Sequence, residues 1–219
     1  MKTKLLFTIL VVLAAATVFA EEEKLKSEPF ALTIIFDTSW STEHDNNTFK
    51  SLARQIIAKL SPGDYLEVIT SRSGKPRLCV AQFIKSGTPE EVKGITSIIE
   101  KVNSQFLSDA SISSAAHLAL NRLKQTSEKN SYAHKAVIIF SDGKLNDNDV
   151  KKLEKLYAGL AENNIRIYIT GSYSTNKKLL IAANQGKLTF SLITEANPVL
   201  WVQQNRGCFY SWPGSIAER

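Results

Sequence analysis

The chain has 219 residues, and its 27 Lys and Arg against 21 Asp and Glu give a formal charge of +6. This length suits one domain with its own hydrophobic core. The basic residues are scattered, whereas nucleic-acid binding needs a stripe of Lys and Arg with aromatic residues nearby. Composition therefore argues against a nucleic-acid-binding protein and favours an ordinary globular domain.

Residues 1–20 have the pattern of a secretory signal peptide. Lys2 and Lys4 precede an apolar run over residues 5–18, and small residues suit cleavage after Ala20. The run is shorter than the roughly 20 residues that cross a bilayer. We therefore expect an exported protein, periplasmic or extracellular, with no stable membrane span after cleavage; an uncleaved anchor is the alternative. Cleavage would lower the formal charge from +6 to +4.

After a charged leader at residues 21–29, strand and helix patterns alternate along the chain. Continuous apolar runs are typical of strands buried on both faces, and apolar residues at helical spacing indicate amphipathic helices. Strands are predicted at 32–36, 65–71, 77–84, 135–140, 165–171 and 188–193. Helices are predicted at 49–60, 88–102, 112–124, 146–164, 178–186 and 198–204.

This alternation predicts an α/β fold with a doubly wound, mostly parallel six-stranded sheet and helices on both faces. The second and third strands are separated only by residues 72–76, "RSGKP", which favours a hairpin and thus one antiparallel edge strand. We expect a single domain over residues 30–203 and an irregular tail over residues 204–219.

Two of the predicted buried strands end near an aspartate. Asp37 follows the first strand, and Asp142 follows the fourth. In doubly wound sheets, ligands bind beyond the carboxyl ends of the strands. If these strands are neighbours, both carboxylates meet at one edge, where Ser39 and Ser41 add hydroxyl groups. Such an all-oxygen cluster suits Mg²⁺ or Mn²⁺, ahead of Ca²⁺.

The alternative is that Asp37 and the serines cap the helix that follows, which is a common arrangement. A cap accounts for one acceptor at one helix start. It does not explain why two separate strands bring an acidic residue to the same edge. The pattern therefore favours a metal site.

The segment Asp37-Thr38-Ser39-Trp40-Ser41 is similar to the D-x-S-x-S motif of von Willebrand factor type A (vWA) domains. "VIIFSDG", at 137–143, resembles the strand that supplies their later aspartate, and the resemblance covers residues 30–203. It implies a metal-ion-dependent adhesion site (MIDAS). In that family the serines bind the ion directly, and the aspartates bind it directly or through water. An acidic side chain of a partner protein completes the octahedron, so the implied activity is protein recognition and not catalysis.

The middle loop departs from the family pattern. The family usually supplies a threonine just before the third helix, but residues 106–120, "FLSDASISSAAHLAL", contain none. Ser111 could replace it with a hydroxyl, and Asp109 could replace it with a carboxylate. If Ala110 holds the position, water would take the threonine's place and the ion would be bound more weakly.

Trp40 and the two cysteines each allow two interpretations. Trp40 could pack against a neighbouring loop or stand exposed beside the metal as an interface anchor. Cys79 and Cys208 could form a disulfide, which export permits, or remain two separate thiols.

The favoured function is an exported protein-binding module without catalytic residues. The first alternative is a structural subunit of an envelope or secretion assembly with a vestigial metal site, which the missing threonine supports. The second is a metal-dependent phosphoester hydrolase, since such enzymes share the strand-end acid. Asp37, however, has no second nearby acid of the D-x-D kind, and the chain shows neither a phosphate-binding glycine loop nor an obvious general base. Neither the partner nor the oligomeric state follows from the sequence.

Overall fold

The structure is a computed structural model that describes residues 29–72, 75–104, 111–132, 134–171, 177–185, 190–192 and 198–205. The predicted signal peptide and most of the charged leader and tail lie outside these residues, as do Asp109 and Cys208. Among the described helices, none combines the length and apolarity that crossing a membrane requires.

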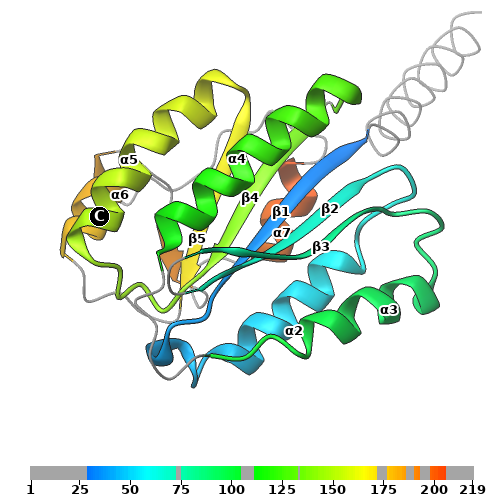
Figure 1. The fold of residues 1–219 in the computed structure, drawn as a ribbon, viewed down its shortest axis with the longest axis horizontal. Helices are drawn as coiled ribbons and strands as arrows, with labels where there is room; N and C mark the ends of the chain where they lie inside the picture. Colours follow the sequence, from blue (N-terminus) through cyan, green and yellow to red (C-terminus); the bar gives the residue numbers. More distant parts are fainter. Residues whose placement is uncertain are drawn as a thin grey trace, which may run out of the picture.

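The described strands form a six-stranded sheet in the order β3-β2-β1-β4-β5-β6 (Figure 1). The strands are β1 (Phe30–Asp37), β2 (Tyr65–Ser71), β3 (Arg77–Phe83), β4 (His134–Phe140), β5 (Ile165–Gly171) and β6 (Phe190–Leu192). Within this sheet β3 pairs antiparallel with β2 at one edge, and the other pairs are parallel. The predicted fold class is confirmed.

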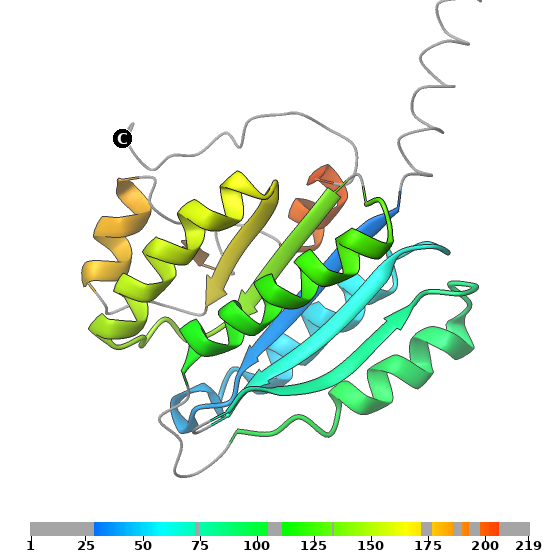
Figure 2. The ribbon, with the colours of Figure 1, turned by 45° about the horizontal axis from the view of Figure 1, so that its top comes forward.

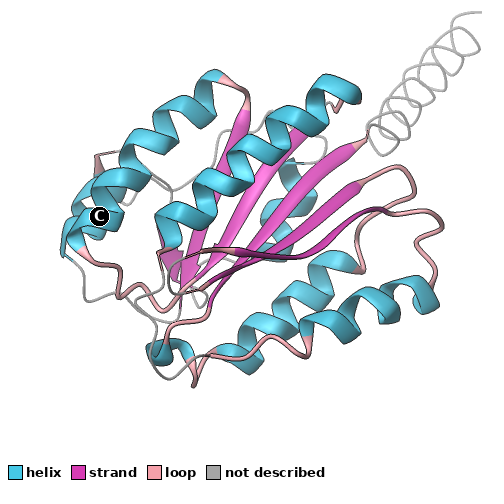
Figure 3. Ribbon diagram, in the orientation of Figure 1, coloured by secondary structure: helices cyan, strands magenta, loops and turns pink. Residues whose placement is uncertain are grey.

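Helices cover both faces of this sheet, as Figure 3 shows. The helices are η1 (Trp40–Thr42), α2 (Asn46–Ile57), α3 (Pro89–Ile99), α4 (Ile112–Lys129), α5 (Asp147–Glu162), α6 (Lys177–Asn184) and α7 (Pro198–Asn205). Residues of α2, α3 and α7 share one hydrophobic cluster with the sheet, and residues of α4, α5 and α6 share the other.

The central strand β1 contributes to both clusters, because successive side chains of a strand point to opposite faces. Phe30, Leu32 and Ile34 pack with α2, whereas Ala31 and Ile35 pack with α4. All eight residues of β1 are buried. A continuous apolar run was therefore the correct signal for a strand covered on both faces.

Several helix ends differ from the predicted ones; α3, for example, ends at Ile99 and not at residue 102. Helix α2 ends at Ile57, not residue 60, because the backbone tightens into i→i−3 hydrogen bonds from Lys59 and Leu60. Leu60 nevertheless stays buried, so the apolar spacing continues past the end of the helix. Helix α4 runs on to Lys129 through polar residues that the apolar pattern did not include.

A polar network lies inside the α4 side of the core. Glu67 on β2 is fully buried and accepts hydrogen bonds from Arg122 Nε at 2.7 Å and Tyr65 Oη at 2.8 Å. Thr33 Oγ1 donates to its other carboxylate oxygen at 3.3 Å. The guanidinium of Arg122 therefore supplies the counter-charge that a buried carboxylate needs.

Replacing Arg122 with Met should lower the free energy of unfolding by about 3 kcal/mol, because Glu67 stays buried without a counter-charge. Urea unfolding measures the change. The matched control is Arg54→Met, which breaks the Arg54–Glu100 pair, whose side chains are 48% and 47% exposed. That control should cost less than about 1 kcal/mol. Equal losses in the two variants would contradict a special role for the buried pair.

Candidate metal centre

The pairing of β1 with β4 brings the two predicted strand-end acids together. These strands are adjacent and parallel, with Phe36 opposite Phe140. Asp37 and Ser141–Asp142 therefore leave the sheet at the same edge. Figure 2 shows β1 and β4 running side by side toward the edge where η1 lies.

Each aspartate turns the chain out of its strand in the same way. Asp37 Oδ1 accepts the backbone N–H of Ser39 at 2.9 Å, and Asp142 Oδ1 accepts that of Lys144 at 3.0 Å. A side chain that binds the N–H two residues ahead makes an Asx turn. One oxygen of each carboxylate is thus used locally, and the second remains for other partners.

The second oxygens have different environments. Asp37 Oδ2 accepts a hydrogen bond from Ser141 Oγ at 2.8 Å. Asp142 Oδ2 is buried and receives no hydrogen bond, and the Lys144 Nζ atom is 3.5 Å away. A buried carboxylate oxygen without a donor is unfavourable. A bound cation would satisfy it, so the residues at this edge fit a metal ion.

The two serines of the D-x-S-x-S segment lie together at η1. Their Oγ atoms are 3.1 Å apart. Thr42 Oγ1 holds this turn by donating to the carbonyl oxygens of Asp37, at 3.0 Å, and Ser39, at 2.7 Å. No side-chain cap bond is made at the start of either η1 or α2. The capping alternative is therefore not supported for these serines.

The electrostatics of the edge also favour a cation. Burial raises the pKa of the Asp37 carboxyl above its ordinary value of 3.8. Hydrogen bonds from Ser39 and Ser141 oppose this rise in pKa, and the negative charge of Asp142 adds to it. Two carboxylates that disfavour each other's charge would both be stabilised by a shared divalent ion.

Two glycines allow the strand ends to come this close. Gly143 has a φ of 79°, which other residues rarely adopt, and its N–H donates to Ser141 Oγ at 3.2 Å. At Gly171, a Cβ atom would lie 2.2 Å from the carbonyl oxygen of Ser141. Any side chain at 171 would therefore push the segment that carries Ser141 and Asp142 away from β5.

Ser111, proposed for the missing threonine position, lies at the start of α4. Its Oγ accepts the backbone N–H of Ser114 at 3.2 Å, and it donates to Asp149 Oδ1 at 3.2 Å. The described contacts of this hydroxyl thus lead to α5 and not to Asp37. Its role as a metal ligand stays a prediction, and the alternative, Asp109, lies outside the described residues.

The sequence reasoning missed two residues here, Ser141 and Asp149. Ser141 sits beside the predicted Asp142, but nothing local indicated a bond to Asp37. Asp149 is buried, its backbone N–H donates to Asn146 Oδ1 at 2.8 Å, and Asn146 Nδ2 donates to its Oδ2 at 3.1 Å. The N-x-x-D spacing of this reciprocal cap could have indicated it. Among the described residues, no three His, Cys, Asp or Glu gather into a metal-binding group.

The structure also bears on the residues with two interpretations. Trp40 is 60% exposed, which favours an interface anchor over packing against the loop. Cys79 forms no disulfide among the described residues, and Cys208 lies outside them, so the disulfide stays a prediction.

The sequence profile of the von Willebrand factor type A domain matches residues 31–197. Among curated protein sequences, none matches this chain.

Solved structures share the fold at low sequence identity. Proximal thread matrix protein 1 from the mussel byssus, with a zinc-occupied MIDAS motif, is 16% identical with a TM-score of 0.56, over 81% of this chain and 46% of that chain. Manganese-loaded TRAP protein of Plasmodium vivax is 16% identical with a TM-score of 0.55, over 79% and 72%. The VWA domain of SpRpn10 is 17% identical with a TM-score of 0.52, over 82% and 98%. This chain thus spans less than half of the mussel protein, and these likenesses show the fold.

The ammonium group of Lys144 lies 3.5 Å from Asp142 Oδ2, where it would compete with a bound metal ion. The variant Lys144→Gln tests this competition. In chelator, the variant should lose about 1 kcal/mol of unfolding free energy, because Asp142 loses its ion pair. In Mn²⁺, it should bind the ion more tightly than the unmodified chain, since no ammonium group competes. Calorimetric titration with Mn²⁺ measures this, with Lys151→Gln as the control for net charge. Equal Mn²⁺ affinity in all three proteins would contradict the competition.

Proposed function

This chain belongs to the von Willebrand factor type A family, and we propose that it is a protein-recognition module that acts through a divalent cation. Asp37, Ser39, Ser41 and Asp142 would hold the ion at the carboxyl edge of the sheet. Ser111 or Asp109 would contribute from the middle loop. The cation, when bound, supplies a positive centre for an acidic side chain of the partner protein.

The observation that carries this proposal is the buried Oδ2 atom of Asp142, which has no hydrogen-bond donor. It belongs to one of two carboxylates at the edge, the other being Asp37, and two serine hydroxyls lie beside them. Carboxylate and hydroxyl oxygens are ligands that Mg²⁺ and Mn²⁺ prefer, ahead of Ca²⁺. The mussel and Plasmodium vivax structures carry zinc and manganese, respectively, so related folds do take divalent ions.

Each residue of the site has a role that the geometry supports. Ser141 orients the Asp37 carboxylate through its hydrogen bond, and the Asx turn at each aspartate aims the chain away from the sheet. The exposed ring of Trp40, between the two serines in sequence, offers a large apolar surface next to the ion. Aromatic anchors of this kind often carry much of the energy of a protein interface.

We expect Asp37→Asn to bind Mn²⁺ at least about tenfold more weakly, because a neutral amide replaces a charged ligand. Calorimetric titration measures the affinity. The matched control, Glu128→Gln, removes one exposed negative charge from the far end of α4 and should bind Mn²⁺ like the unmodified chain. Unchanged affinity in Asp37→Asn would contradict the assigned site.

Recognition is tested separately by selecting displayed random peptides on the immobilised chain. In Mn²⁺, the enriched peptides should contain Asp or Glu at a recurring position. With excess chelator, or with Asp37→Asn, that enrichment should disappear. Mn²⁺ binding without cation-dependent enrichment would instead favour a structural subunit, and enrichment that survives chelation would exclude recognition through the ion.

We also propose that residues 1–20 direct export and are removed. Their apolar run and the small residues before Glu21 support this. Intact-mass measurement of the chain recovered outside the cytoplasm should give a mature protein that starts at Glu21. Recovery of the full-length chain in the membrane fraction would contradict cleavage.

A further inference from the structure

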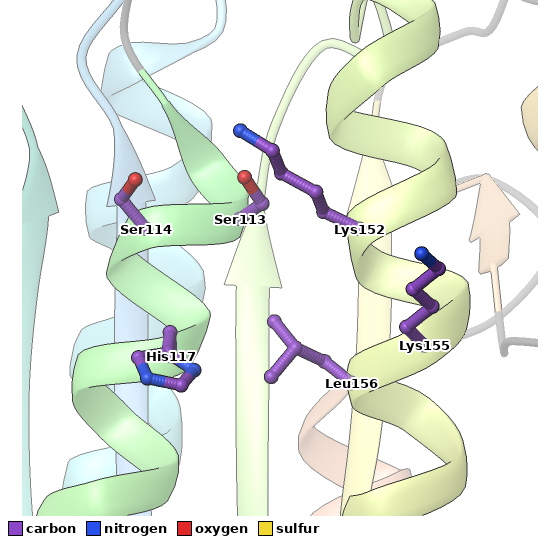
Figure 4. Close-up of a pocket in the computed structure, with 6 residues that line it drawn as sticks. All are labelled: Ser113, Ser114, His117, Lys152, Lys155 and Leu156. Carbon is purple, nitrogen blue, oxygen red and sulfur yellow. The ribbon is translucent and has the colours of Figure 1, made fainter.

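A hollow of about 380 Å³ lies between α4 and α5, formed by side chains that the proposed recognition function does not use. Ser113, Ser114 and His117 line it from α4, and Lys152, Lys155 and Leu156 line it from α5 (Figure 4). Its volume falls within the range of small-molecule sites. None of these residues belongs to the candidate metal centre.

One wall of the hollow is cationic. Lys152 and Lys155 are three residues apart on α5, so they share one side of the helix. Both are exposed, and neither has an ion-pair or hydrogen-bond partner among the residues that the structure describes. Figure 4 shows Lys152 extending from α5 toward Ser113. The lining contains no acidic residue, so its positive charge is not balanced from within.

Asp149, the carboxylate that contacts the lining residue Ser113, already has hydrogen-bond partners. Its Oδ1 accepts from Ser111 Oγ at 3.2 Å, from the Ser113 N–H at 3.4 Å and from the Ser113 hydroxyl, and its Oδ2 accepts from Asn146. It is also buried and absent from the lining of the hollow. Asp149 therefore fastens the start of α4 to α5 and does not neutralise the two lysines.

The rest of the lining provides a hydroxyl, from Ser114 on α4, and the less polar side chains of His117 on α4 and Leu156 on α5. Ser114 is exposed, and its Oγ donates to Ser111 Oγ at 2.8 Å, because the Ser111 proton is directed at Asp149. Leu156 extends from α5 toward α4, and the ring of His117 lies on α4 below the two serines (Figure 4). The hollow thus combines an anion-binding end with a side that suits a ring or a short apolar group.

We propose that this hollow binds a small phosphorylated or sulfated molecule. The tetrahedral anion would lie between the ammonium groups of Lys152 and Lys155, because hydrogen bonds from a charged donor to such an anion are stronger than neutral ones. The rest of the ligand would rest on Leu156 and His117. This site needs no divalent cation and stands independently of the proposed recognition function.

Calorimetric titration of the full chain in chelator tests the proposal, with phenyl phosphate and phenyl sulfate as probes. The unmodified chain should bind at least one of them saturably, and the stronger probe identifies the class. The double variant Lys152→Gln/Lys155→Gln should lose about tenfold or more in affinity. Inorganic phosphate should bind more weakly than phenyl phosphate, and equal affinity would remove Leu156 and His117 from the site.

The matched control is Lys151→Gln/Lys124→Gln, which removes the same charge from exposed positions on α5 and α4 outside the hollow. It should bind both probes like the unmodified chain. Equal losses in the two double variants would overturn the proposal, as would the absence of saturable binding. Binding that requires Mn²⁺ and vanishes in Asp37→Asn would also overturn it, because the probe would then be held by the metal centre. Urea unfolding of each variant verifies that these exposed substitutions leave the fold intact.

Discussion

The in-register parallel pairing of β1 with β4 is the constraint on which the candidate metal centre depends. It sets Phe36 opposite Phe140, so the residues that follow leave the sheet together. A shift of one residue would turn every side chain of a strand to the other face. Such a shift of β1 would be strongly destabilising, because all eight of its residues are buried and it pairs with both β2 and β4. The hydrophobic core thereby positions Asp37 relative to Asp142.

The same edge concentrates negative charge in a buried place. Asp37 has a raised pKa because of burial, and Asp142 keeps one oxygen without a hydrogen-bond donor. Lys144, at 3.5 Å, compensates part of this charge from a half-exposed position. Any ion that binds the folded chain here and not the unfolded one also stabilises the fold. Cation binding and folding stability are therefore linked at this site.

Asp149 organises a second region on the α4 side of the sheet. It fastens the start of α4 to α5 through Ser111, Ser113 and Asn146. This attachment holds the end of the middle loop and one rim of the hollow that Lys152 borders. The helices on this face thus do more than cover the core, since their facing surfaces create a separate polar site.

The sequence by itself determined the fold class, the antiparallel edge strand and the presence of Asp37 and Asp142 at strand ends. Those features follow from side-chain periodicity and turn residues, which are local. Only the tertiary structure decided that Ser141, 104 residues from Asp37, orients its carboxylate, and that Ser111 contacts Asp149. It also decided that Trp40 is exposed and that Lys152 and Lys155 border a hollow, not merely a solvated face. The physical reason is that such contacts depend on strand order and helix placement, and a local pattern relates a residue only to its neighbours along the chain.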